Sequence, residues 1–279
     1  MMNHGYLTRS AERPSLWAML LATALAGCAS NQGGGNVGVF GNEPDATPNT
    51  AYATAAQDAM IRADQAAKTA DSAPIDPKKD AERERNLHLK LVQDMMSQNN
   101  AYAALAHLDA YDQRWGANRQ SRLIRAGAYR KTGQLDKAEL AYRTLLNGAT
   151  PGQQTGALWY GLGKVSVDKD ELGTAAQRFE KAAQSDPLNI NAYTDLGLVY
   201  LLTGRKDEAY NNLMKATQLA NGENPTATAN LALWGLVYGD TGLAQSIADQ
   251  LKWTDSTRKK VTAQANVIRK RLESKGVNP

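Results

Sequence analysis

The chain has 279 residues, with 32 lysines and arginines against 28 aspartates and glutamates. This small surplus is too weak for the broad basic surface that binds nucleic acid. The single cysteine excludes an internal disulfide, so packing must stabilise the fold. Hydrophobic residues make up 42% of the chain, but only two are Phe. The many alanines instead predict closely approaching helices, and hence an all-α protein.

The first element is an export signal at residues 1–27. Arg9 and Arg13 precede an apolar run from Leu16 to Leu25, and small residues come just before Cys28. As a helix, ten residues rise only about 15 Å, half of a bilayer's hydrocarbon core, which argues against a permanent transmembrane anchor. The stretch Leu25-Ala26-Gly27-Cys28 resembles the lipobox of bacterial lipoproteins.

That resemblance implies cleavage before Cys28 and a covalent lipid on Cys28, the only cofactor that we expect. Ala29 and Ser30 follow without an aspartate, which resembles the outer-membrane sorting pattern of Gram-negative lipoproteins. We therefore expect a chain that is lipid-anchored in the outer membrane and faces the periplasm. The alternative is a small apolar cysteine inside a cleaved signal. Without residues 1–27, the chain has 30 basic and 27 acidic residues and is nearly neutral.

Residues 28–84 form a spacer between the lipid and the folded domain. The part from Ala29 to Thr50 consists largely of Gly, Asn, Pro, Thr and Ser, and cannot bury enough surface to order itself. Residues 51–70 favour a marginal, Ala-rich helix. Pro74 and Pro77 interrupt before the charged run 78–85. As a flexible coil, the spacer separates lipid and domain by roughly 40 Å on average.

Internal repeats decide the fold of residues 85–254. Gly163 and Gly197 are 34 residues apart, each within the same pattern of large and small residues. Two antiparallel helices pack closely only where side chains are small, and large residues fill the remaining space. The residues assigned to this packing are Trp159, Leu162, Gly163, Ala175, Phe179, Ala182, Pro187, Tyr193, Leu196, Gly197, Tyr200, Ala209 and Ala216. This pattern resembles the tetratricopeptide repeat.

The resemblance implies about five repeats in a superhelical solenoid of antiparallel helix pairs. An alanine opens the second helix of each pair, at positions 104, 138, 175, 209 and 244. The longest spacing between successive alanines, from 138 to 175, is accommodated by a loop at 147–154. Gly133, Gly204 and Gly239 lie at the turns between the two helices of a pair, where a positive φ is common. Residues 255–279 give a capping helix from Asp255 to Lys275, followed by a tail. Val261, Ala265, Ile268 and Leu272 form an apolar stripe on this helix, which would cover the exposed end of the solenoid.

Catalytic and metal-binding motifs are missing from the sequence. His88 and His107 have no cysteine or carboxylate cluster nearby, and the lysine of Gly161-Leu162-Gly163-Lys164 is followed by Val165, which excludes a phosphate loop. Asp168, Asp170 and Glu171 lack the further ligands of a calcium loop, so we interpret them as a solvated turn. We expect no catalytic residue, no metal site and no enzyme activity.

The final helix is strongly basic, with Arg258, Lys259, Lys260, Arg269, Lys270 and Arg271. It either contacts anionic phospholipid, peptidoglycan or an acidic partner, or is simply a capping helix with a charged outer face.

In tetratricopeptide domains, the first helix of each repeat lines a concave groove that binds protein partners. Carried onto this chain by that resemblance, the groove residues are Gln120, Leu123, Arg130, Tyr160, Lys164, Asn191, Thr194, Leu198 and Leu201. The cationic set that binds acidic C-termini in this family is largely replaced here by Leu, Tyr and Thr, so an apolar or amphipathic segment fits better. The alternative is that some of these leucines pack between adjacent repeats.

A lipid anchor, a spacer and a repeat domain together resemble the TadD-like lipoproteins of the Flp/Tad tight-adherence pilus. The segment Asn230-Leu231-Ala232-Leu233, followed by Ala244, resembles the closing repeat of that family. The resemblance implies a scaffold that binds a secretin or another assembly component of an outer-membrane pilus or secretion machine. The alternative is an adaptor that organises cell-envelope or peptidoglycan enzymes. The sequence does not indicate the oligomeric state.

Overall fold

The computed structural model describes residues 77–149 and 151–279. Every element in these ranges is an α-helix, which confirms the predicted all-α class. The helices are α3 (Pro77–Ser97), α4 (Ala101–Trp115), α5 (Arg119–Lys131), α6 (Leu135–Leu146), α7 (Gln153–Asp168), α8 (Leu172–Ser185), α9 (Ile190–Thr203), α10 (Lys206–Leu219), α11 (Pro225–Tyr238), α12 (Thr241–Gln250) and α13 (Asp255–Glu273).

The chain divides within α3, between Leu91 and Val92. Residues 77–91 belong to one part, and the rest of α3 with α4–α13 forms the second, which we call the repeat array. The charged run 78–85 forms the start of α3. Pro77 occupies the first position of this helix, where the N–H group that proline lacks would have no partner within the helix. The predicted signal, Cys28, the spacer up to residue 76 and the marginal helix at 51–70 lie outside the described residues.

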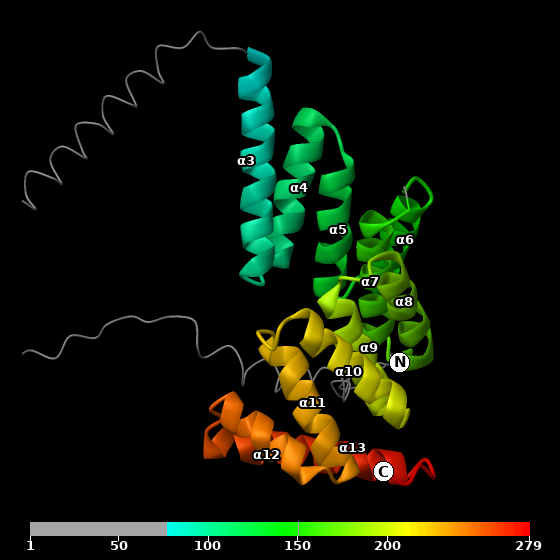
Figure 1. Cartoon of the computed structure of the whole chain (residues 1–279). Coiled ribbons are helices and arrows are strands. Elements are labelled where there is room, and N and C mark those ends of the chain that lie inside the picture. The colour runs from blue at the N-terminus through cyan, green and yellow to red at the C-terminus, as the bar shows by residue number, and fades with distance from the viewer. Residues whose placement is uncertain (1–76, 150) are drawn as a thin grey trace, which may run out of the picture. The chain divides into compact units, whose positions relative to one another are not determined.

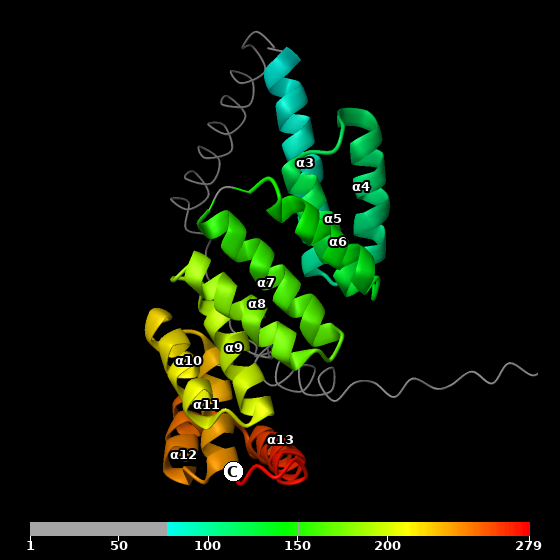
Figure 2. The same cartoon turned by 90° about the vertical axis from the view of Figure 1, so that its right-hand side faces the viewer.

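Helices of the array pack in antiparallel pairs, α5 with α6, α7 with α8, α9 with α10 and α11 with α12 (Figures 1 and 2). The five alanines expected to open the second helices each occupy the fourth residue of α4, α6, α8, α10 or α12. All five are buried. α7 begins at Gln153, so the predicted loop at 147–154 is shorter by two residues.

Each turn from a first helix to a second helix contains one residue in the left-handed conformation. Gly133, Gly204 and Gly239 have φ of 75°, 80° and 86°, as predicted. Asn99 and Asp170 take the same place before α4 and α8, with φ of 61° and 59°. Asn and Asp tolerate this conformation better than other non-glycine residues do. One turn geometry therefore recurs along the array despite different residues.

Close approach of the two helices in a pair depends on the predicted small residues. A Cβ on Gly163 would lie 2.5 Å from the Phe179 ring, and one on Gly197 would lie 2.7 Å from Leu213 Cγ. Most of the predicted packing residues are buried: Leu162, Ala175, Phe179, Ala182, Leu196, Tyr200, Ala209 and Ala216. Trp159 and Tyr193 are half-buried, and Pro187 is exposed just after α8 ends.

Candidate functional site: the concave face of the repeat array

The first helices of successive repeats lie along one face of the array. α5 contacts α7 and α9 contacts α11, whereas no comparable contact joins two second helices in the described chain. In a solenoid the helices that approach each other most closely lie on the inside of the curve, so α5, α7, α9 and α11 line the concave face. This is the face on which the groove residues are predicted.

An ion pair joins two of these helices. Arg130 Nη1 in α5 lies 2.8 Å from Asp168 Oδ2 in α7, and both side chains are largely removed from solvent. Asp168 is the last residue of α7, where the helix dipole disfavours a negative charge. Arg130 therefore compensates a carboxylate in an unfavourable place. The solvated-turn interpretation holds for the exposed Asp170 and Glu171, but it is wrong for Asp168.

A hydrogen bond continues the row from α7 to α9. The Tyr160 hydroxyl donates to Asp195 Oδ2 at 2.9 Å. Lys164 follows one turn after Tyr160, with its Nζ 5.4 Å from the centre of the Tyr160 ring. Burial raises the pKa of both Tyr160 and Asp195, and the positive charge of Lys164 opposes the rise at Asp195. Burial also lowers the pKa of Lys164, while Asp195 opposes that change.

These groups form a row of alternating charge across three helices, which we call the concave polar row: Arg130, Tyr160, Lys164, Asp168 and Asp195. Arg130 and Lys164 stand 34 residues apart, at the same position of successive repeats. Arg130 is paired with Asp168, and Lys164 and Asp195 carry opposite charges that interact electrostatically, so the row presents donors and acceptors without a net charge. It therefore differs from a cationic clamp for acidic C-termini.

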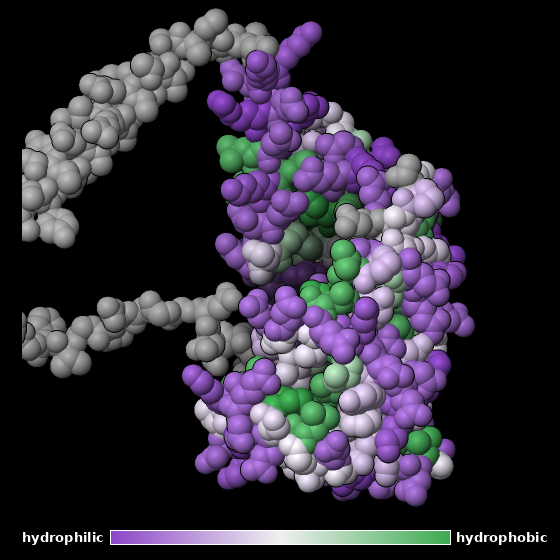
Figure 3. Space-filling view, in the orientation of Figure 1, coloured by the Kyte–Doolittle hydropathy of each residue, from purple (hydrophilic) through white to green (hydrophobic). Residues whose placement is uncertain are grey.

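An apolar cavity of about 250 Å³ lies between the first turns of α5 and α7. It is lined by the apolar side chains of Leu123, Leu145, Ala157 and Leu158, together with Arg119 and Gln154. Arg119 donates a hydrogen bond to the Leu145 carbonyl at 3.3 Å. The cavity is large enough for an apolar side chain of a partner. The space-filling view shows such apolar patches within a mostly hydrophilic surface (Figure 3).

The predicted groove residues fall into two groups. Gln120, Leu123 and Asn191 are exposed, and Arg130, Tyr160 and Lys164 are half-buried. Thr194, Leu198 and Leu201 are buried, with relative exposures of 3%, 6% and 0%. The two leucines belong to the main hydrophobic core, and Thr194 Oγ1 donates to the Ile190 carbonyl. In α9, these three positions therefore serve packing rather than an open surface.

The placement of α13 accounts for part of this difference. α13 contacts α11 and α9, both first helices, so it lies against the inner side of the last two repeats. Ala265, Ile268 and Leu272 join the same core as Leu198 and Leu201, as the predicted apolar stripe requires. Val261, the fourth residue of that stripe, is half-buried against this core. The open part of the concave face is thereby restricted to α5, α7 and the start of α9.

Sequence reasoning missed the two carboxylates of the concave polar row. Asp168 was assigned to a turn, and Asp195 carried no expectation. One signal was present in the sequence: Tyr160 and Asp195 are one repeat length plus one residue apart, which places them on adjacent first helices. Predicting the hydrogen bond between Tyr160 and Asp195 also requires the angle between α7 and α9, which the repeat register does not give.

The described residues contain no group of three or more His, Cys, Asp and Glu that could hold a metal ion. His88 and His107 are half-buried, in α3 and α4. In the same residues, no helix is both long enough and apolar enough to cross a membrane.

Comparisons with known proteins agree with this geometry. The family model described as tetratricopeptide repeat matches residues 190–222, which hold α9 and α10. A comparison with curated proteins gives no match.

Two of the solved structures that share the fold have a TM-score above 0.5. One is a thermophilic tetratricopeptide-repeat protein, TTC0263 from Thermus thermophilus, with 18% identity, a TM-score of 0.53 and coverage of 66% of this chain and 98% of that one. The other, from a study titled as the functional characterization of Pseudomonas aeruginosa pilF, has 16% identity, a TM-score of 0.53 and coverage of 68% and 92%. At such low identity these likenesses concern the fold alone. Together with the recurring helix pairs, they show that the chain has a tetratricopeptide-like solenoid fold, with a tetratricopeptide-repeat match at residues 190–222.

Proposed function

We propose that this protein is a scaffold that holds a partner protein along the concave face of α5, α7 and the start of α9. Tetratricopeptide arrays generally act through protein–protein contacts, and they are generally not enzymes. The observation that carries the proposal here is the concave polar row, with the apolar cavity beside Leu123 on the same helices. A row of hydrogen-bond donors and acceptors next to an apolar cavity suits an amphipathic segment of a partner protein.

The cellular setting is a further part of the proposal. The lipobox-like sequence at 25–28 supports a lipid on Cys28 and a place on the periplasmic side of the outer membrane. The resemblance to TadD-like lipoproteins supports a role in assembling a Flp/Tad-type pilus, with a secretin or another assembly component as the partner. An anchor would confine both proteins to the membrane plane and so raise their effective concentration.

The test uses a matched pair of variants. Leu123→Asp places a charge in the concave cavity, at a side chain that is 37% exposed. Leu140→Asp makes the same change on the second helix α6, at a side chain that is 68% exposed and outside the concave face. Neither side chain is in the core, so both variants should fold, which circular dichroism would verify.

The unaltered protein would be purified from its own outer membrane after mild crosslinking, and the proteins recovered with it identified. A secretin or pilus component that is retained with Leu140→Asp and lost with Leu123→Asp would support the proposal. Recovery of cell-wall enzymes instead would favour the adaptor function. A partner retained by both variants would contradict the concave site.

A further inference from the structure

The last helix, α13, has an unusual distribution of charge. Between Ser256 and Leu272 it contains six lysines and arginines and no acidic residue. Asp255 and Glu273 stand only at its two ends. The first turn of α10, by contrast, mixes Lys206 with two acidic residues. A capping helix needs one apolar stripe, but it does not need such an excess of positive over negative side chains.

Two of the six cations are used within the fold. Arg258 Nη2 lies 2.7 Å from Asp249 Oδ1, and its Nε donates to the Trp253 carbonyl. Arg269 donates to the carbonyls of Leu236 and Val237, near the end of α11, where cations favour the helix dipole. These two arginines fasten α13 to the array.

The other four cations do not serve the fold in this way. Lys259, Lys260 and Lys270 are exposed and Arg271 is half-buried. In the part of the chain that the structure describes, no hydrogen bond or ion pair from their side chains is present. At about 3.6 residues per turn, Lys259, Lys260 and Lys270 lie on the side of the helix away from the buried residues Ala265, Ile268 and Leu272, and Arg271 lies at the edge of that side.

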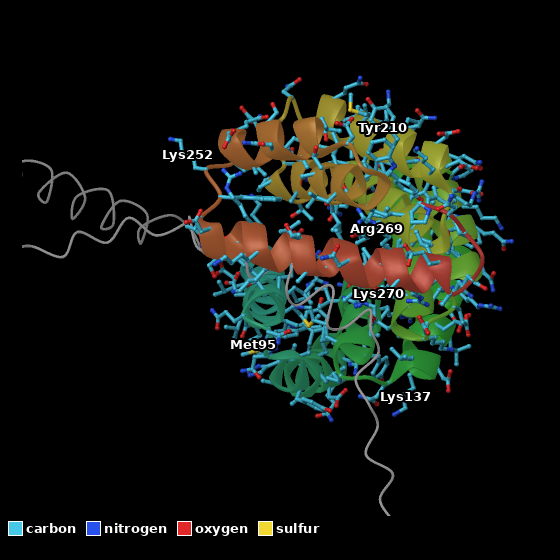
Figure 4. The ribbon with its side chains drawn as sticks, turned by 90° about the horizontal axis from the view of Figure 1, so that it is seen from below. Met95, Lys137, Tyr210, Lys252, Arg269 and Lys270 are labelled. Carbon is cyan, nitrogen blue, oxygen red and sulfur yellow. The ribbon has the colours of Figure 1, made fainter. Side chains whose placement is uncertain are left out.

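Two further features accompany these cations. Val267, 44% exposed, lies between the lysines. Lys252 before the helix and Lys275 after it are also exposed and extend the charge. In the view from below, α13 lies across the end of the array, with Lys252 at one end and Lys270 along it (Figure 4). We call this surface the α13 basic face: Lys252, Lys259, Lys260, Lys270, Arg271 and Lys275.

The chemistry of this face favours an extended anionic surface. α13 is about 28 Å long at 1.5 Å per residue, so its cations are spread along a line rather than gathered around a cavity. Lysines predominate, and they act as point charges rather than as the planar forks that clamp a single phosphate or carboxylate. The helix has no aromatic side chain on which a nucleic-acid base could stack. An exposed valine among lysines suits the boundary between lipid headgroups and acyl chains.

We propose that the α13 basic face binds the phosphate headgroups of an anionic phospholipid bilayer and lays the C-terminal end of the array on the membrane. This contact is independent of the concave face, which lies on other helices, and of any lipid on Cys28. The array would then meet the membrane at its C-terminal end, and the concave face of α5 and α7 would stay open to a partner.

The test measures co-sedimentation of the full chain carrying Cys28→Ser, so that no lipid is attached, with two kinds of vesicle. One contains 30 mol% phosphatidylglycerol in phosphatidylcholine and the other contains phosphatidylcholine alone. The test variant is Lys259→Gln/Lys260→Gln/Lys270→Gln. The control variant removes the same charge from exposed sites elsewhere, Lys137→Gln/Lys206→Gln/Lys215→Gln.

We expect binding to the anionic vesicles in 0.1 M salt, with loss of most of it in 0.5 M salt because the charges are then screened. The test variant should bind on the order of 100-fold more weakly, and the control variant should change by less than about threefold. All proteins share the apolar segment 16–25, so the ratio of anionic to neutral vesicle binding is the readout.

Three results would overturn the proposal. The first is an equal loss of binding in the two variants. The second is binding that does not depend on phosphatidylglycerol. The third is retention of the chain on polyglutamate without binding to the vesicles, which would assign the face to an acidic polymer or protein. Circular dichroism melts of both variants would show that the array is intact, because all six lysines are on the surface.

Discussion

The ring of Phe179 in α8 lies directly against the backbone of Gly163 in α7. A Cβ atom at position 163 would fall 2.5 Å from two ring carbons, closer than side chains tolerate. Both residues are buried, so neither can move toward solvent. This contact sets the distance between the two helices of the third repeat.

Gly163→Ala should therefore lower the stability of the array by about 1–3 kcal/mol, because overpacking outweighs the gain in helix propensity. Gly173→Ala, in α8, is the matched control, since a Cβ there meets nothing within 4 Å. The control should raise the unfolding midpoint slightly. Urea unfolding followed by circular dichroism measures both, and equal midpoints for the two variants would contradict the packing described here.

Gly204→Ala should destabilise the protein more than Gly239→Ala. Both glycines have a positive φ, so each substitution costs about 1 kcal/mol of backbone strain. Only at position 204 would the new Cβ also meet the C-terminal segment, 2.9 Å from Val277 and 3.2 Å from Leu272. Nothing lies within 4 Å of a Cβ at position 239.

Hydrogen exchange of the amides in α13 provides the specific readout for this pair. Gly204→Ala should accelerate exchange there, whereas Gly239→Ala should leave it nearly unchanged. Equal exchange in both variants would mean that α13 does not depend on its contact with the turn after α9.

Glu139 should make the array sensitive to acid. Lys169, which bonds to its carboxylate, is the main reason that its pKa is lowered to about 2, and Arg178 adds to the effect. A pKa below the unfolded value stabilises the fold above about pH 5, and this contribution is lost as pH falls from about 5 to about 2. Solvent screens the group in part, so the contribution at pH 7 is on the order of 2 kcal/mol.

Glu139→Gln should lower the unfolding midpoint at pH 7, and the difference from the unaltered protein should shrink as the pH approaches 2. Glu223→Gln, at an exposed site before α11, is the control and should have little effect at any pH. A constant difference between the Glu139 variant and the unaltered protein across this range would show that the carboxylate is not held ionised by its cations.

The pair Arg130–Asp168 should show measurable coupling in a double-mutant cycle with Arg130→Gln and Asp168→Asn. Its side chains are only 18% and 26% exposed. We expect a coupling energy of about 1 kcal/mol, compared with about 0.3 kcal/mol for the exposed pair Arg205–Glu208. Additive effects at positions 130 and 168 would indicate that the ion pair is absent in solution.

Much of the array could be predicted because one pattern repeats. The alanines at 138, 175 and 209 and the glycines at 163 and 197 identify the helix pairs, since only small residues permit such close packing. The positive φ at Gly133, Gly204 and Gly239 follows from the same pattern. Asp170 performs this function without being glycine, so the repeat pattern alone did not reveal it.

The candidate site was less predictable. The groove positions in α5 and α7 follow from the register, and Leu123, Arg130, Tyr160 and Lys164 retain some exposure. In α9 the same register gives Leu198 and Leu201, which are buried. Their burial depends on a core that α13 joins, and α13 lies outside the repeat pattern. A local register cannot show which surface a non-repeating element will occupy.

The docking of α13 also affects how the array comes apart. In a linear array each repeat contacts only its neighbours, so unfolding can start at either end. Here α13 reaches past the pair formed by α11 and α12 to α9, in the preceding pair. The last two pairs are therefore joined through α13 as well as through the contacts between their own helices. We expect fraying to begin at α4 and α5 and to advance toward the C-terminus. The C-terminal end, which α13 covers, is then the more stable end of the array.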